Sequence, residues 1–314
     1  MPTTTAEETR SAPRPLAPRG ADQIVSAAIA AIAYADVFDW PLTATEVHRF
    51  LPVPARPDEV AAALAASQRS GAVAPAGGLY VLPGRQALAG SRRRREMTAA
   101  RLWPSAVRSC RVLASLPWVR LVAVSGSLAV GAAEDDADVD LFIVTVDGRV
   151  WLARALTIAL GKAAARARRR QDIWLCPNYL LTATALELPE RDVFTAHELA
   201  QLVPLFGPDA YRALLTANPW YRDFLPNHPG YPGPIADLRG PRARRAMEPI
   251  LGNRLVSRLE RWEMERKIAR LGARSASAEV RFDATTCKGH FGGYRRRTLE
   301  SLGATMARLE GLAS

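Results

Sequence analysis

The stretch Val124–Thr145, VSGSLAVGAAEDDADVDLFIVT, constrains the fold more than any other part of the chain. It begins with a Gly-Ser turn, passes through an acidic segment and ends in an apolar run typical of a buried strand. Asp138 and Asp140 stand two apart where that strand begins, so their side chains project from one face of the sheet. Carboxylates that close repel each other and are costly to bury. We therefore expect a cation between them, and Mg²⁺ prefers such oxygen ligands.

The Gly-Ser turn predicts a second ligand beside that cation. Gly126 follows a β-rich run and lets the backbone approach a bound molecule closely. Ser127 can cap a following short helix, where exposed backbone N–H groups favour phosphate. The sequence thus predicts phosphate binding at Gly126 and Ser127 and metal binding at Asp138 and Asp140, joined by one loop.

The pattern Gly126-Ser127-x-Ala129-x-Gly131, followed by Asp138-x-Asp140, resembles the signature of the DNA polymerase β-like nucleotidyltransferase superfamily. The resemblance covers residues 118–182, and Asp138 follows Ser127 by 11 positions. It implies an enzyme that moves a nucleoside monophosphate from a nucleoside triphosphate to a hydroxyl acceptor and releases pyrophosphate. It also implies two Mg²⁺ (or Mn²⁺) ions held by the Asp pair and a third carboxylate.

The resemblance leaves two candidates for the position of the third carboxylate. Asp172 begins the predicted strand Asp172–Thr182 and completes a catalytic set of Asp138, Asp140 and Asp172. Asn178 lies six residues further on and shares its parity, so Asn178 can occupy the position instead and lower the metal affinity. Pro177 indicates that this strand lies at a sheet edge or contains a bulge.

The order of predicted elements favours a mixed α+β fold: a nucleotidyltransferase-type sheet with flanking helices, an N-terminal winged helix-turn-helix and a C-terminal helical region. Thr43 and Glu46 form a predicted capping box, and Gly77-Gly78 predicts a hairpin after a helix over Asp58–Ser70. The chain of 314 residues is divided as follows: a disordered tail (1–20), a winged-helix-like domain (21–84), a helical connector (85–117), a catalytic domain (118–188) and a mainly helical region (189–314).

Three helix predictions outside the motif bear on the fold. Pro104 suits the first turn of a second helix within the connector. Thr195–Leu205 is interpreted as one helix. Met247–Leu271 is predicted to be a long amphipathic helix with an apolar stripe at helical spacing, which contains Leu251, Leu255, Leu259 and Trp262.

The net charge of +11 and the pI of about 10.3 favour polyanionic partners. Arginine clusters occur at 92–95, 166–170, 242–245 and 295–297, and together they suggest nucleic-acid binding (RNA or DNA). The predicted recognition helix begins with Asp58 and Glu59, so the winged helix is as consistent with protein contacts as with base reading. The alternative function is therefore a nucleic-acid-binding regulator whose nucleotidyltransferase domain is degenerate or senses nucleotide. Lys288 is a candidate phosphate contact from the C-terminal region.

Three cysteines without a CxxC pair argue against disulfides and structural zinc, and the four histidines show no metal-ligand spacing. The chain shows no secretory signal and no stretch long enough to span a membrane, so we expect a cytoplasmic protein without membrane partners. RNA ends, a small hydroxylated metabolite and a protein side chain all remain open as acceptors, as does the oligomeric state.

Overall fold

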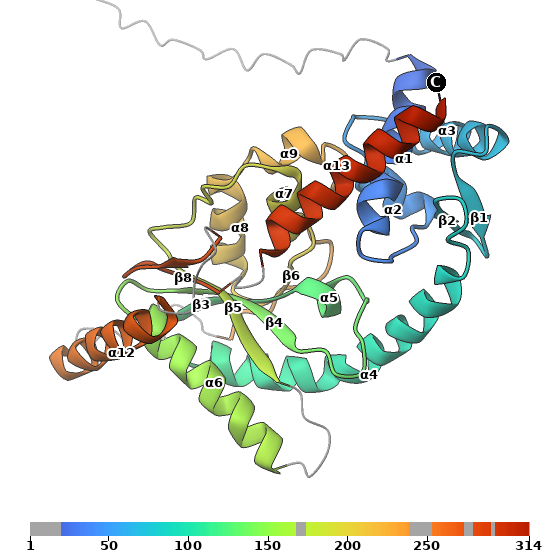
Figure 1. The fold of residues 1–314 in the computed structure, drawn as a ribbon. Helices are drawn as coiled ribbons and strands as arrows, with labels where there is room; N and C mark the ends of the chain where they lie inside the picture. The colour runs from blue at the N-terminus through green and yellow to red at the C-terminus, as the bar shows by residue number, and fades with distance from the viewer. Residues whose placement is uncertain (1–19, 168–173, 239–252, 273–278, 290–292, 314) are drawn as a thin grey trace, which may run out of the picture.

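A six-stranded sheet organises the computed structural model, which describes residues 20–167, 174–238, 253–272, 279–289 and 293–313 (Figure 1). The central strands are β3 (Val119–Ser125), β4 (Val139–Thr145) and β5 (Leu175–Thr182). The outer strands are β6 (Val203–Phe206) beside β3, then β8 (Thr286–Lys288) and β7 (Arg281–Phe282) beyond β5. Only β4 and β5 pair in parallel within this described sheet. The predicted mixed α+β class with flanking helices is confirmed.

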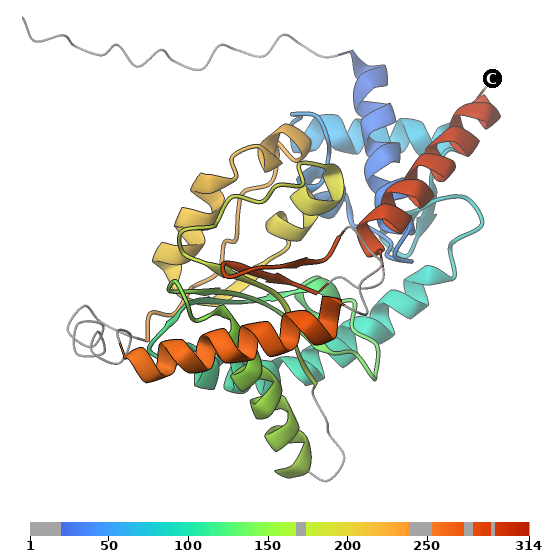
Figure 2. The same ribbon diagram turned by 60° about the vertical axis from the view of Figure 1, so that its left-hand side comes forward.

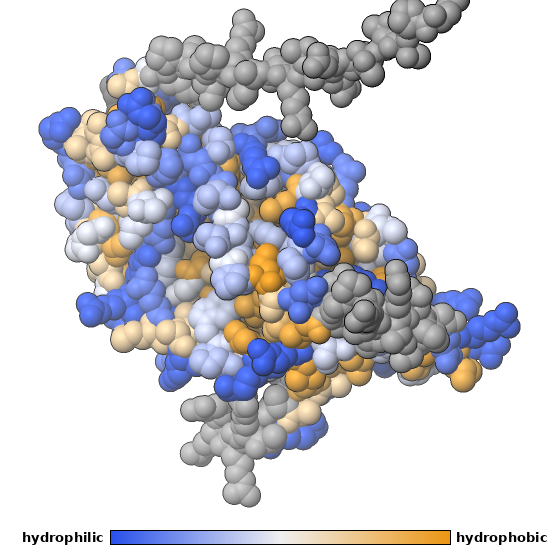
Figure 3. All heavy atoms as spheres, turned by 180° about the vertical axis from the view of Figure 1, so that it is seen from behind, coloured by the Kyte–Doolittle hydropathy of each residue, from blue (hydrophilic) through white to orange (hydrophobic). Residues whose placement is uncertain are grey.

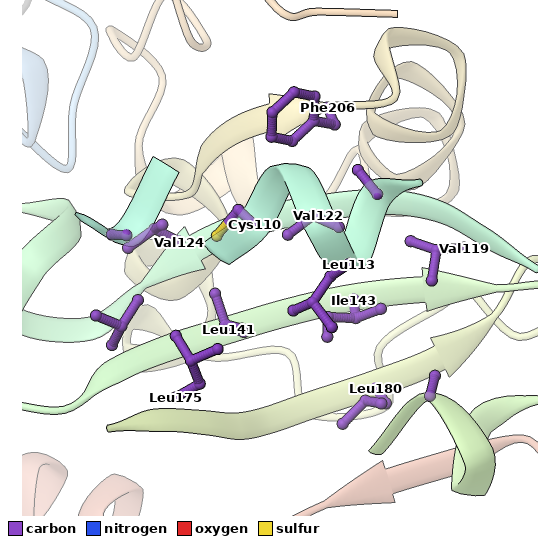
Figure 4. Close-up of a cluster of buried hydrophobic side chains, with 14 of the residues drawn as sticks. Cys110, Leu113, Val119, Val122, Val124, Leu141, Ile143, Leu175, Leu180 and Phe206 are labelled. Carbon is purple, nitrogen blue, oxygen red and sulfur yellow. The ribbon is translucent and has the colours of Figure 1, made fainter. Parts of the chain in front are cut away.

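Both faces of the sheet are covered, which explains why its central strands are almost wholly apolar. The helix α6 (Val150–Ala167) makes the crossover that parallel neighbours need, and with α4 (Leu88–Ala114) it covers one face. Cys110 and Leu113 of α4 pack there among the valines and leucines of β3 and β4 (Figure 4). The helices α7 (Val193–Ala200), α8 (Pro208–Ala217) and α9 (Tyr221–Phe224) cover the face that carries Phe142 and Tyr179.

The N-terminal unit has a core of its own. It comprises α1 (Ala21–Asp36), α2 (Ala44–Arg49), α3 (Pro57–Arg69) and the antiparallel pair β1 (Ala74–Ala76) and β2 (Leu79–Val81). The capping box is confirmed, because the Glu46 N–H donates to Thr43 Oγ1 at 3.2 Å and the Thr43 N–H donates to Glu46 Oε2 at 2.7 Å. The hairpin is confirmed as well, with Gly77 and Gly78 at positive φ.

Two helix predictions are wrong in part. Pro104 lies inside the 27-residue helix α4 instead of beginning a second helix, so packing against the sheet outweighs the hydrogen bond that proline removes. The helix predicted over Thr195–Leu205 ends at Ala200, and the segment after it becomes β6, because the free edge of β3 accepts a further strand.

The last two helices, α12 (Arg254–Gly272) and α13 (Tyr294–Ala313), lie on opposite sides of the sheet (Figures 1 and 2). The helix α13 runs beside α1 and α7, whereas α12 crosses the outside of α6. The helix predicted over Met247–Leu271 is described from Arg254 onward as α12, and Leu251 lies outside the described residues. The rest of the predicted stripe, Leu255, Leu259 and Trp262, is exposed. The buried side of α12 carries Glu260 and Met264 instead, so the stripe is not the face that packs on the body.

The surface is mixed in character. Seen from behind, hydrophobic side chains reach the surface mainly in the middle of the face, with hydrophilic ones around them (Figure 3). No helix in the described part of the chain is both long and apolar enough to cross a bilayer. All three cysteines are free thiols. The tail predicted to be disordered lies almost wholly outside the described residues.

Candidate functional site

Gly126 lies directly against the carboxylate of Asp140. It opens the short helix α5 (Gly126–Ala129) at φ +64°, directly after Ser125, the residue that pairs with Asp140 across β3 and β4. A Cβ at this glycine would lie 2.4 Å from Asp140 Oδ2, closer than any side chain tolerates. The predicted phosphate turn and the predicted metal ligand are therefore in contact, and only glycine allows both the backbone conformation and the approach.

The two aspartates differ in environment. Asp140 is half-buried within β4, and this burial raises the pKa of its carboxyl to about 6, an effect that the charge of Asp138 increases and a hydrogen bond with the Cys176 thiol reduces. Asp138 is exposed because it precedes the first residue of β4, and its pKa is raised by partial burial and by Asp136. The expectation of two buried carboxylates thus holds for Asp140 alone. Among the described residues, no cationic side chain is a main influence on the pKa of either carboxyl.

Cys176 occupies the position on β5 that neighbours Asp140. A bulge follows, in which Leu141 pairs with Pro177 and Phe142 with Tyr179, so that Asn178 is the extra residue. The bulge reverses which residues face each side of the sheet, and the parity that linked Asn178 to Asp172 does not carry through the strand. Pro177 does mark this bulge, in an interior strand rather than at an edge. Asp172 itself lies outside the described residues.

Lys288 belongs to the sheet, on β8, rather than to a helical region. It pairs with Tyr179 of β5, and its Nζ lies 5.2 Å from the centre of the Tyr179 ring. The side chain is only 2% exposed, and Nζ lies 3.1 Å from Glu190 Oε1. A phosphate contact from Lys288 would therefore compete with this ion pair. The row Phe142, Tyr179 and Lys288 runs across the sheet one step along from Asp140.

Glu198 of α7 is a functional candidate that the sequence did not reveal. Burial raises the pKa of its carboxyl to about 7; the positive charge of Lys288 opposes this rise, and Asp140, Glu190 and Asp192 add to it. Glu198 therefore shares an electrostatic environment with Asp140 and Lys288. It comes from the segment that follows β5, and no spacing in the sequence connects it to the Asp pair.

Ser125 provides a further unexpected group. Its side chain is 8% exposed, and its Oγ has no hydrogen-bond partner among the described residues. Since Leu121 and Ala123 pack with Phe142 and Tyr179, the alternation along β3 places Ser125 on the face that also carries Asp140. A buried hydroxyl without a partner costs stability, so a ligand that bonds it is a physical reason for its presence.

Asp138 and Asp140 are the described residues that would hold a magnesium ion. They offer two carboxylates at the start of β4, and Mg²⁺ is commonly bound by one or two carboxylates together with water and phosphate oxygens. Within the described ranges, no group of three or more Asp, Glu, His or Cys side chains is arranged to hold a metal.

The N-terminal unit contacts the sheet unit close to this site. The ring of Tyr34 in α1 stacks on His197 of α7, with ring centres 3.9 Å apart. Burial raises the pKa of Tyr34, and the charges of Glu198 and Asp192 raise it further. His197 is buried, and this burial lowers the pKa of its imidazole to about 3, an effect that His228 increases. The helix α1 therefore lies beside Glu198.

Part of the predicted basic stripe faces inward. Arg92 is buried over Trp40 and its Nη1 lies 2.7 Å from Glu46 Oε2, while Arg95 lies over the same ring and 2.9 Å from Glu134 Oε1. These two arginines fasten the N-terminal unit to α4. The clusters at 166–170 and 242–245 lie largely or wholly outside the described residues.

Comparison with known proteins adds no further identification. No family model, curated protein or solved structure matches the chain. The functional proposal below is therefore based on the sequence pattern and on the contacts within this site.

Proposed function

We propose that the chain is a metal-dependent nucleotidyltransferase with a polymerase β-like catalytic fold and an N-terminal winged helix. The contact between Gly126 and Asp140 is the observation that carries the proposal, because it joins a phosphate-binding turn to a metal-binding carboxylate. The antiparallel β3–β4 pair, the α6 crossover and the parallel β5 support the same fold. Three helices followed by a hairpin support the winged helix.

Each group has a distinct part in the proposed reaction. The backbone at Gly126 and Ser127 binds the triphosphate, and Asp138 and Asp140 hold the magnesium ion that comes with it. When bound, such an ion would supply positive charge to offset the negative charge on the phosphates. The acceptor hydroxyl oxygen forms a bond to the α-phosphorus while the bond to the pyrophosphate oxygen breaks. Glu198 accepts the hydroxyl proton, a role suited to a carboxyl with a pKa of about 7.

The alternative function, a nucleic-acid-binding regulator, receives less support. Arg92 and Arg95 are engaged within the fold. The exposed residues of α3, the helix that would read bases, include Asp58, Ala61 and Ala62, which offer little to a base edge, and Arg69 is exposed only at its last position. Weak binding of short RNA and DNA duplexes at low salt, where phosphate contacts are strongest, is the expected result under our proposal.

The proposal is tested with a matched pair of double variants. In the first, Asp138→Ala and Asp140→Ala are combined; in the control, Glu134→Ala and Asp135→Ala remove the same charge from exposed positions in the same loop. Pyrophosphate release from each nucleoside triphosphate is measured with Mg²⁺ and with chelator, over a panel of RNA, hydroxylated small molecules and protein acceptors. The control should behave as the parent, whereas equal turnover in the first variant would refute the proposal.

A further inference from the structure

The outer face of α12 carries an unusual stripe of exposed apolar side chains. Leu255, Leu259 and Trp262 are 70%, 50% and 55% exposed. They are separated by four and then three residues, the spacing of a helix that packs along another helix. Arg266 continues the stripe, and its guanidinium lies 4.9 Å from the centre of the Trp262 ring.

The opposite face of α12 is already committed to the body of the protein. Glu260 accepts hydrogen bonds from the backbone N–H groups of Trp151 and Leu152, both at 2.8 Å, in the first turn of α6. Met264 and Ile268 pack against the core beneath the sheet. These contacts fix the rotation of the helix and leave its stripe exposed. The helix itself lies at the periphery of the molecule (Figures 1 and 2).

The charged residues beside the stripe can form ion pairs with the same residues of a second copy. Arg258 and Glu265, both exposed, each precede a stripe residue and are seven apart, so they lie in equivalent positions on the same side of the stripe. When two such helices pack antiparallel, Leu259 of one lies opposite Trp262 of the other. The same arrangement brings Arg258 opposite Glu265 twice, related by the two-fold axis.

We propose that α12 is a self-association helix, through which two copies of this chain pair in an antiparallel, two-fold symmetric arrangement. A second copy satisfies the apolar stripe and both charge signs at once. A polyanion would leave the leucines without an apolar partner and would meet repulsion from Glu265. The proposal is independent of the nucleotidyltransferase activity and concerns a surface on the far side of the sheet from α7 and α13.

The first test is the molar mass of the full chain in solution, by sedimentation equilibrium across micromolar concentrations. The parent should populate a dimer, and Leu259→Glu should weaken the dimer at least a hundredfold. Val112→Glu is the matched control, since Val112 is a 51% exposed apolar residue of α4, and it should leave the dimer unchanged. Circular dichroism confirms that each variant keeps its helix content. A parent that stays monomeric, or a dimer that survives Leu259→Glu, would overturn the proposal.

The second test distinguishes specific pairing from general stickiness and does not depend on Leu259→Glu folding. Arg258→Glu and Glu265→Arg should each weaken the dimer about tenfold. The double variant should regain it, and so should an equimolar mixture of the two single variants, because the ion pairs are then restored between copies. Failure of either rescue would overturn the antiparallel arrangement. So would a monomeric parent whose tryptophan fluorescence is quenched by a single-stranded oligonucleotide, with the quenching lost in Trp262→Phe, which would assign the face to a polyanion.

Discussion

Two buried carboxylates on different sides of the molecule, Asp140 at the site and Glu260 in α12, have opposite surroundings. Burial raises the pKa of each. Glu260 accepts two backbone N–H groups and lies near Arg149, so its two oxygens are occupied within the fold. Asp140 shares a hydrogen bond with the Cys176 thiol and lies beside the like charge of Asp138.

The difference shows how a structural acid is told from a functional one. A carboxylate that has donors for both oxygens stabilises the element that provides them. A carboxylate that has a weak donor and a like charge beside it destabilises the fold unless a ligand arrives. Exchanging each acid for its amide should therefore change stability in opposite directions.

Asp140→Asn should reduce nucleotidyl transfer by about a thousandfold or more, because an amide is a poor ligand for a magnesium–triphosphate complex. The measurement is pyrophosphate release under saturating nucleotide. Activity within tenfold of the parent would place Asp140 with Glu260 as a structural acid.

The same variant should be more stable than the parent without ligand. The pKa of Asp140 in the folded chain, about 6, lies above its ordinary value of 3.8, so the penalty for ionised Asp140 is absent below about pH 4 and complete above pH 6. A pKa difference of this size corresponds to at most about 3 kcal/mol in the free energy of unfolding. Urea unfolding should show this gain at pH 8 and almost none at pH 4; a loss at pH 8 would contradict the comparison.

Glu198→Gln tests whether a third carboxylate behaves like Asp140. We expect about a hundredfold slower transfer at pH 8, because the amide cannot accept the acceptor's proton. In the parent, kcat/KM should fall tenfold per pH unit below about pH 7, where Glu198 becomes protonated, and more steeply below pH 6, where Asp140 follows. The variant should lack the break near pH 7. An unchanged break would remove Glu198 from the proposed reaction.

Glu260→Gln should destabilise the chain by about 1–3 kcal/mol, because an amide has one acceptor oxygen for the two N–H groups of Trp151 and Leu152. The NH2 group of the amide would face one of the two backbone N–H donors and could not accept its hydrogen bond. Thermal unfolding measures the loss, and transfer activity of the folded protein should be unaffected. A gain in stability would show that burial outweighs the two hydrogen bonds.

Ser125→Ala should have the smallest effect, a three- to tenfold rise in KM for the triphosphate. Stability should be unchanged or slightly greater, because the Oγ has no partner among the described residues. Ser125→Thr, which keeps the hydroxyl, is the control. Equal KM values for the parent and the alanine variant would mean that no ligand bonds this hydroxyl.

Local patterns in the sequence predicted much of the fold. The capping box at Thr43, the glycine hairpin and the strands beside the Gly-Ser turn depend on neighbouring residues, and such signals survive in the folded chain. Pairings between segments far apart in the chain could not be predicted from local sequence patterns. Nothing near Val203 reveals that the edge of β3 will recruit it, and nothing near Leu255 reveals which side of its helix packs on α6.

The residues of the candidate site also form two groups, those that local spacing connects and those that only the folded sheet brings near. Gly126 and Asp138 with Asp140 lie in one short segment, so spacing alone connected them. Glu198 and Cys176 reach the site through α7 and through the register of β5, which depend on packing of the whole sheet. The unbroken alternation assumed for β5 failed because a bulge is set by tertiary pairing, of which Pro177 was the only local sign.

The bulge at Asn178 also means that the length of β5 decides which residue lies beside Asp140. With the pairing of Tyr179 to Phe142 held by the core and the bulge kept at one extra residue, inserting one residue after Pro177 would slide the start of β5 by one place and bring Pro177 instead of Cys176 beside Asp140. A single inserted codon there would change which side chain lies beside Asp140, and it would also move Leu175 from its place in the core. Descendants of such a sequence could gain or lose a third ligand by changing length rather than by substitution.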